Sequence, residues 1–121
     1  MKNIITAFLL IISINCFSQD TITTAQAKDY MNKMVCVKGK VVSFKLASEG
    51  KNTNYINIDK PYPESVFTVV ISNSYLEKLN LKIEDLKDKD IYIKGTISIY
   101  KNDPKQIPQI FNPISIDVKK E

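Results

Sequence analysis

The sequence predicts a single small all-β domain with one helix inserted between its third and fourth strands. Three observations support this prediction. Stretches in which apolar and polar residues alternate recur along the chain, as is typical of half-buried strands. One stretch, residues 73–88, instead spaces its apolar residues as a helix does. The chain has 121 residues, which suits one compact domain and is too short for two.

The first 18 residues are expected to be a secretory signal. One lysine precedes an apolar run over residues 4–14, which is too short to span a bilayer, and small or polar residues follow it. Cleavage is expected after Ser18 or Gln19, leaving residues 19–121 as one exported domain, periplasmic or secreted. A lipoprotein signal ending at Cys16 is an alternative, although the residues before it are not small. A buried N-terminal strand or helix is the other alternative.

The residue types that are missing exclude several chemistries. The chain has no histidine and no arginine, and all 17 of its basic residues are lysines. Without histidine there is no Ser-His-Asp or Cys-His system and no imidazole metal ligand. We therefore expect no enzyme, no cofactor and no metal site. Cys36, the one cysteine left after cleavage, lies in an apolar run and is expected to be a buried thiol with no intramolecular partner.

The first half of the domain predicts a helix and three strands. Residues 24–33 contain helix formers and a threonine that can cap them. Residues 35–46 predict a long strand whose apolar positions change phase around Gly39, where we expect a bulge or sharp bend that lets one strand join two sheets. Residues 53–59 and 66–72 predict the second and third strands, separated by a turn with two prolines.

The second half predicts the inserted helix and the remaining strands. Residues 73–88 have helical spacing, and Ser74 can cap them, although the segment can also divide into a short helix and a turn. Residues 91–100 alternate cleanly, with Gly95 on the inward face, which favours further coiling of the sheet. Residues 106–118 predict a last strand pair or one broken strand.

This order of elements is that of the OB-fold, a five-stranded Greek-key barrel. In it the first strand belongs to both sheets and the helix lies between strands three and four. Four stretches of this chain, residues 35–42, 67–71, 90–97 and 108–110, combine apolar alternation with glycines. Through them the chain resembles small exported bacterial OB-fold domain proteins, related to the nucleic-acid-binding, tRNA-anticodon-type OB-fold group. The resemblance covers residues 26–118.

The resemblance implies a binding site for single-stranded DNA or RNA, or another anionic polymer. It lies on the open face of the second and third strands, between the flanking loops. Lysines would follow the phosphates, tyrosines would stack on bases, and an asparagine would hydrogen-bond to a base edge or to the backbone. The candidate residues are Lys38, Lys40, Lys45, Tyr55, Asn57, Tyr92, Lys94, Tyr100, Lys101 and Lys105.

A simpler interpretation exists for each candidate. Lysines that alternate along a strand are usually the solvated face of a small barrel, and outward tyrosines often cover a sheet. The lack of arginine and a formal charge of only +4 weaken the nucleic-acid hypothesis. The alternative function is a cell-envelope interaction module that binds protein or glycan, for example by adding a partner strand to a sheet edge. Steep salt dependence would distinguish phosphate binding from this alternative.

Overall fold

The computed structural model describes residues 21–120, so the predicted signal over residues 1–18 lies outside the described part of the chain. The described elements, in chain order, are β1 (Thr21–Thr23), the 3-10 helix η1 (Thr24–Tyr30), β2 (Met34–Lys45), β3 (Thr53–Ile58), β4 (Thr68–Ser72), the α-helix α2 (Asn73–Leu79), the 3-10 helix η2 (Ile83–Leu86), β5 (Asp90–Ile99), β6 (Pro108–Phe111) and β7 (Ser115–Val118).

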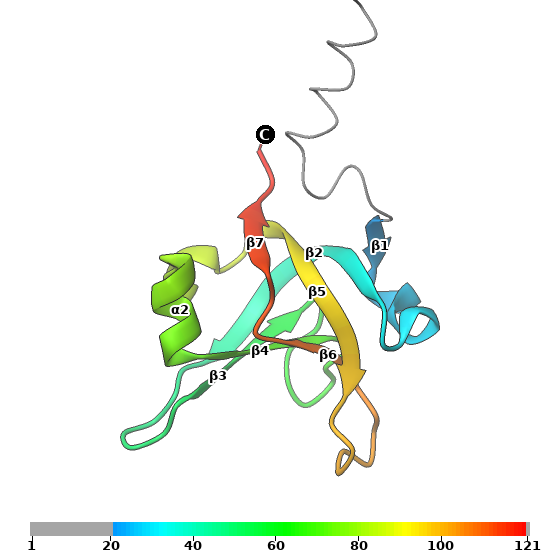
Figure 1. Cartoon of the computed structure of the whole chain (residues 1–121), viewed down its shortest axis with the longest axis horizontal. Coiled ribbons are helices and arrows are strands. Elements are labelled where there is room, and N and C mark those ends of the chain that lie inside the picture. Colours follow the sequence, from blue (N-terminus) through cyan, green and yellow to red (C-terminus); the bar gives the residue numbers. More distant parts are fainter. Residues whose placement is uncertain (1–20, 121) are drawn as a thin grey trace, which may run out of the picture.

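These strands form one sheet that closes on itself. Their order is β1-β2-β3-β4-β6-β5-β7, and β2 also pairs with β5. The closed part therefore consists of β2, β3, β4, β6 and β5, while β1 and β7 extend it on the side of β2 and β5 (Figure 1). Strands β4 and β6 run parallel, and the other barrel pairs are antiparallel. The helix α2 lies between the third and fourth barrel strands, as predicted.

Strand β2 belongs to both halves of the barrel, which confirms the prediction for the first long strand. Residues 34–40 pair with β5 and residues 41–45 pair with β3, with a register shift after Val41. The irregularity therefore begins two residues after Gly39, close to the predicted position. Gly39 is needed for close packing, because a Cβ atom there would collide with the side chain of Ile58 in β3.

The core is built from the inward residues of every barrel strand. They are almost all β-branched, which suits a tightly curved sheet. The fully buried side chains of the strands and of the residue before β4 include Val37, Val41, Ile56, Ile58, Phe67, Val69, Ile71, Ile91, Ile93, Ile97 and Ile110. Gly95 faces this core, as predicted, and a Cβ atom at that position would lie 2.5 Å from Ile110 Cγ2. The predicted alternation of β5 is thus confirmed.

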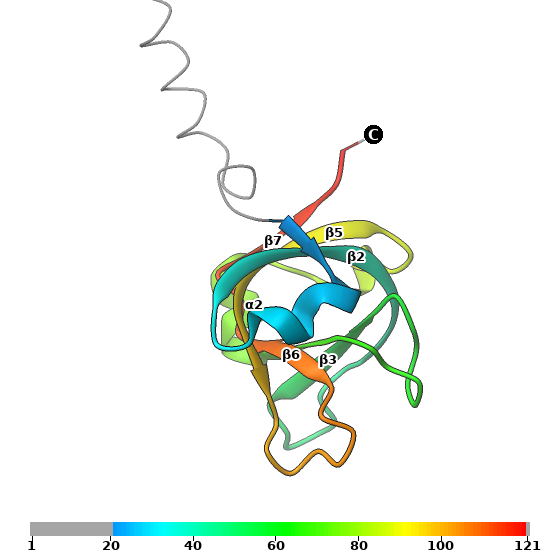
Figure 2. The ribbon, with the colours of Figure 1, turned by 90° about the vertical axis from the view of Figure 1, so that its right-hand side faces the viewer.

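Helical elements cover the barrel on two opposite sides. Figure 2 shows η1 in front of the barrel in a view turned by 90° from Figure 1, with α2 behind it. Ala27 is the buried apolar residue of η1, and Ile83 and Leu86 are those of η2. The carboxylate of Asp59 fixes η1 to the barrel, because it accepts a hydrogen bond from Thr24 Oγ1 at 2.6 Å.

The predicted helix over residues 73–88 is divided into two pieces. Asn80, in the left-handed conformation with φ of 54°, ends α2, and η2 follows three residues later. The capping residue is Ser72 and not Ser74, since Ser72 Oγ accepts from the backbone N–H of Tyr75 at 3.3 Å. None of the helices within residues 21–120 is long and apolar enough to cross a membrane.

Cys36 is completely buried, as its apolar surroundings predicted. It is disulfide-bonded, and no cysteine in the described part of the chain is free. The expectation of a thiol without an intramolecular partner concerned the chain after cleavage, so it stays a prediction. The predicted last segment consists of two separate strands. Strand β6 pairs with β4 and β5, whereas β7 pairs with β5 alone among the described strands.

Candidate nucleic-acid interface

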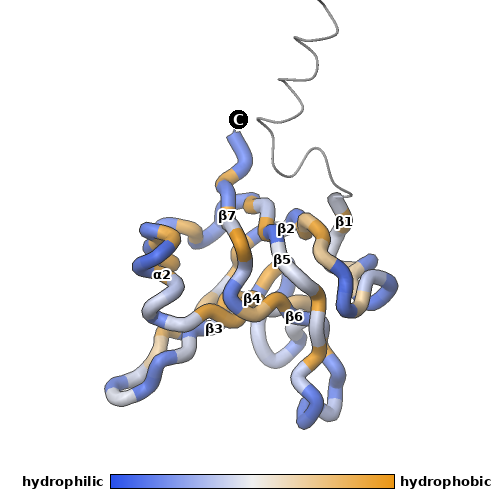
Figure 3. Tube along the Cα trace, viewed as in Figure 1, coloured by the Kyte–Doolittle hydropathy of each residue, from blue (hydrophilic) through white to orange (hydrophobic). Residues whose placement is uncertain are grey.

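One face of the barrel lies between two projecting loops. Strands β3, β4 and β6 are neighbours in the sheet. The β2–β3 loop (residues 46–52) and the β5–β6 loop (residues 100–107) project toward the same side of the molecule, on either side of these strands (Figure 1). Both loops are largely hydrophilic, whereas the strands between them carry hydrophobic residues (Figure 3). The arrangement leaves a partly apolar surface flanked by polar loops.

A row of four outward residues crosses this face. The register pairs Lys45 of β2 with Tyr55 of β3, Tyr55 with Val70 of β4, and Val70 with Phe111 of β6. Paired residues in a sheet point to the same face. Tyr55 is 42% exposed and Phe111 is 56% exposed, whereas Val70 between them is only 8% exposed. We call Lys45, Tyr55, Val70 and Phe111 the aromatic row.

A polar row runs beside the aromatic row. It consists of Ser43, Asn57, Thr68, Gln109 and Ser98, from five strands in register. Asn57 is only 8% exposed, which differs from the expectation that it is available to a ligand. Its Nδ2 donates to Ser43 Oγ at 2.9 Å, and its Oδ1 accepts from Ser65 at 3.2 Å and from Thr68 at 3.4 Å. The amide of Asn57 therefore holds neighbouring segments together.

Four of the candidates lie on the other part of the sheet, formed by β1, β2, β5 and β7. They are Lys38, Lys40, Tyr92 and Lys94. Tyr92 pairs with Lys38 on one side and with Asp117 on the other, and Lys40 pairs with Asp90. Asp90 and Asp117 therefore lie close to the lysines of this surface and offset part of their positive charge. This surface is separate from the aromatic row, so Tyr92 and Tyr55 cannot stack on the same short ligand.

The remaining candidates lie in the β5–β6 loop. Tyr100 and Lys101 are exposed at its start. Lys105 is already engaged, because its Nζ donates to the carbonyl oxygen of Pro63 at 3.0 Å and so joins this loop to the β3–β4 loop. Tyr100 and Lys101 thus border the face, whereas Lys105 contributes mainly by positioning two loops.

The carboxylate of Asp103 stabilises the β5–β6 loop through hydrogen bonds within the loop. Asp103 accepts from the backbone N–H groups of Ile107 at 2.8 Å and Lys105 at 2.9 Å. These hydrogen bonds, that of Ile107 first, lower the pKa of Asp103 below its usual 3.8, because they stabilise the charged form. At neutral pH the carboxylate is therefore ionised and available to hold the turn of the loop.

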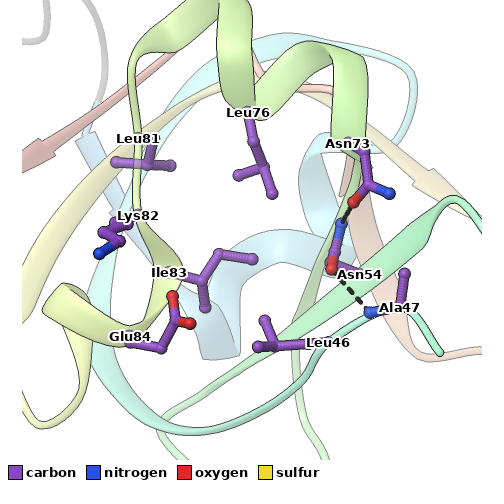
Figure 4. A pocket seen from close by; sticks show the side chains of 9 residues that line it. All are labelled: Leu46, Ala47, Asn54, Asn73, Leu76, Leu81, Lys82, Ile83 and Glu84. Carbon is purple, nitrogen blue, oxygen red and sulfur yellow. Dashed lines mark hydrogen bonds between the residues drawn. The ribbon is translucent and has the colours of Figure 1, made fainter. Parts of the chain in front are cut away.

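The β2–β3 loop is anchored by a buried asparagine. Asn54 Oδ1 accepts from Ala47 N at 2.8 Å, and Nδ2 donates to Ile71 O at 3.0 Å and Asn73 Oδ1 at 2.8 Å. Beside it lies an open hollow of about 330 Å³ between this loop and the α2–η2 segment (Figure 4). Its apolar lining includes Leu46, Leu76, Leu81 and Ile83. It shares no residue with the aromatic row.

Sequence reasoning missed two members of the aromatic row, Val70 and Phe111. The usable signal was the alternation in β6, where the buried Pro108 and Ile110 place Gln109 and Phe111 on the outside. The pairing of Phe111 with Val70 needs the parallel contact between β4 and β6, which the sequence pattern does not reveal. Within residues 21–120, no group of three or more His, Cys, Asp or Glu residues is placed to hold a metal ion.

Comparison with known proteins shows similarity of structure. No family model matches the chain, and no protein of curated function matches it. Yeast Stn1 and Ten1 give a TM-score of 0.59 with 15% identity, over 93% of this chain and 70% of that chain. An OBody, AM1L10, bound to hen egg-white lysozyme gives 0.58 with 18% identity, over 85% and 96% of the two chains.

A putative aspartyl-tRNA synthetase from Leishmania major gives a TM-score of 0.57 with 10% identity. The match covers 86% of this chain but 21% of the synthetase, so the chain spans about a fifth of that protein's length. At these identities the likeness concerns the fold alone. Together with the strand order, it shows that this chain has an OB-fold.

Proposed function

We propose that this protein is a non-catalytic module that binds single-stranded nucleic acid on the aromatic row. The observation that carries the proposal is the pair of exposed rings, Tyr55 and Phe111, on either side of Val70. They lie on the face and between the loops with which OB-folds bind oligonucleotides and oligosaccharides. Stacking of a base on such a ring contributes about 1–3 kcal/mol and tolerates any sequence.

Few cations surround the aromatic row. Lys45 belongs to it, and Lys51 and Lys101 are exposed on the two loops, while Glu49 adds a negative charge nearby. Each phosphate that a lysine neutralises on a single strand contributes a slope of about −0.7 to a plot of log K against log salt. Stacking therefore supplies most of the binding energy in this proposal, and the salt dependence is gentler than the candidate lysines of the sequence suggested.

Fluorescence anisotropy of labelled single-stranded DNA and RNA tests the proposal. With the purified protein, we expect micromolar binding at low salt and a slope of about −1.4 to −2.1 in the log–log plot, from two or three phosphate contacts. Double-stranded DNA of the same length is the matched control, since its bases are not available for stacking. If single strands fail to bind even at low salt, the nucleic-acid function is wrong.

The alternative function keeps the fold and changes the ligand. An envelope interaction module that binds protein or glycan is favoured by the exposed apolar area of Tyr55 and Phe111, and an OBody of similar fold is bound to lysozyme. Such binding would respond little to salt. In both hypotheses the protein is exported, on the basis of the signal predicted over residues 1–18, and mass spectrometry of the secreted or periplasmic fraction would identify the processed N-terminus.

A further inference from the structure

The hollow between the β2–β3 loop and the α2–η2 segment is a second surface of the barrel (Figure 4). Its volume of about 330 Å³ lies near the lower end of the range of about 300–1,000 Å³ that is usual for ligand pockets. Its lining combines the buried side chain of Ile83 with Leu46, which is 40% exposed. The described part of the chain therefore leaves an apolar surface open at this place.

One wall of the hollow is held by the end of α2. Asn80 is the left-handed residue that ends the helix, and its backbone N–H donates to Glu77 O at 3.0 Å. The backbone N–H of Leu81 donates to Leu76 O at 2.9 Å. These two bonds form a Schellman motif, in which the residue after the left-handed one commonly packs on the last turn of the helix. Leu76 and Leu81 are thus held together, yet both are only half-buried.

The opposite wall is fixed to the start of the same helix. The backbone N–H of Asn73 donates to Asn52 O in the β2–β3 loop at 3.0 Å, and Asn73 Oδ1 accepts from Asn54 Nδ2 at 2.8 Å. Asn54 Oδ1 in turn accepts from Ala47 N at 2.8 Å. The loop that carries Leu46 is therefore tied to α2. A surface that is formed before binding loses less conformational freedom when a ligand binds.

Acidic side chains surround this apolar surface. A neighbouring hollow of about 490 Å³ shares Leu76, Leu81 and Lys82 with the first. The charged residues that line the two hollows are Glu77, Lys82, Glu84 and Asp85. Three carboxylates and one ammonium group give this lining a negative charge, although the whole chain has a formal charge of +4. A phosphate backbone is repelled by such a surface, whereas a lysine or arginine is attracted to it.

We propose that this hollow binds a protein partner, through a large apolar side chain that is flanked by lysine or arginine. The apolar side chain enters between Leu46 and Leu81, and the basic neighbour meets the surrounding carboxylates. This inference goes beyond the proposed function, because the hollow shares no residue with the aromatic row. One molecule then holds a nucleic acid on one surface and a protein on another.

Selection from a library of random peptides displayed on phage, against the immobilised full protein, tests the chemistry of the partner. We expect the enriched peptides to place leucine, isoleucine, methionine or phenylalanine beside lysine or arginine. Synthetic copies of these peptides should bind more weakly as salt is raised, since ion pairs at an open surface are screened. A lack of enrichment, or enrichment of acidic peptides, would show that the inference is wrong.

Substitutions in the lining test the place of binding. Leu46→Asn is expected to weaken binding of the enriched peptides about tenfold, because the burial of a leucine side chain is lost. Glu84→Gln is expected to weaken it about two- to fivefold, the contribution of one exposed ion pair. Met34→Asn is the matched control, since Met34 is 44% exposed at the other end of β2, and it should leave the affinity unchanged.

Thermal unfolding of the three variants reports whether the barrel is intact, and the selection on the unmodified protein does not depend on any of them. If Leu46→Asn folds and binds the peptides as the unmodified protein does, the hollow is not their site. Competition with oligothymidine separates this inference from the proposed function. Peptides that oligothymidine displaces bind on the aromatic row, which overturns the inference alone. If oligothymidine does not bind, the proposed function is wrong, and the selection and the variants still decide the inference.

A second copy of this chain is the other occupant to be tested. Val118 is 44% exposed, and Lys119 and Lys120 follow it, so the C-terminal segment also combines an apolar side chain with lysines. Analytical ultracentrifugation of the purified protein measures self-association. We expect a monomer. Self-association that is lost in Leu46→Asn would assign the hollow to a second copy and overturn the proposal of a different protein partner.

Discussion

Replacing Phe67 with alanine is expected to lower the free energy of unfolding by about 3–5 kcal/mol. Among the described residues, Phe67 has the largest fully buried side chain, and it belongs to the hydrophobic core cluster. Its backbone carbonyl accepts a hydrogen bond from Ile58 N at 3.0 Å, so the ring is held at the point where β3 and β4 meet. Truncation removes its apolar contacts and leaves a cavity that a closed barrel cannot readily collapse.

Chemical denaturation followed by circular dichroism measures this loss. Phe67→Leu retains most of the side-chain volume and should cost clearly less than the alanine variant. Tyr62→Ala is the surface control, because Tyr62 is 80% exposed, and it should change the free energy of unfolding by no more than about 0.5 kcal/mol. A loss below about 1 kcal/mol for Phe67→Ala would show that the core does not depend on this ring.

Tyr55→Ala and Phe111→Ala are each expected to weaken single-strand binding by about 1–3 kcal/mol, the contribution of one base stacked on one ring. Both side chains are substantially exposed, so the core does not depend on them. Tyr92→Ala is the matched control, since Tyr92 lies in register with Lys38 and Asp117 on the other part of the sheet. Its affinity for single strands should equal that of the unmodified protein.

Anisotropy titrations of the three variants, with thermal unfolding to confirm the fold, distinguish the two surfaces. Unchanged affinity in both Tyr55→Ala and Phe111→Ala would rule out stacking on the aromatic row. Equal weakening by Tyr92→Ala would instead move the ligand to the surface of β2, β5 and β7, which the sequence had also offered.

The fold was largely predictable because its signals are local. Alternation identified the barrel strands, and the helical spacing of residues 73–88 placed the inserted helix correctly in the order of elements. The register shift in β2 was less accessible. The phase change indicated an irregularity around Gly39, but its exact position after Val41 is defined by the pairing with β3, which no local pattern reports. The break of the helix at Asn80 likewise depends on a single left-handed residue.

The candidate site was only partly predictable, because alternation identifies outward residues but does not say which part of a closed sheet they share. Tyr55 and Tyr92 have the same outward phase, yet they lie in separate registers. Asn57 also has that phase, but its partners come from β2, β4 and the loop before β4, so its burial depends on tertiary contacts. Phe111 joins the site only through the non-local pairing of β6 with β4.

Backbone amide NMR shifts on addition of a short oligothymidine test the central claim most directly. The account predicts that the shifted amides gather at Tyr55, Val70 and Phe111 and in the loop over residues 100–107, while those of Lys38 and Lys94 stay in place. Shifts concentrated on β2, β5 and β7 instead, or no shifts at saturating oligonucleotide, would contradict the assignment of the aromatic row as the binding site.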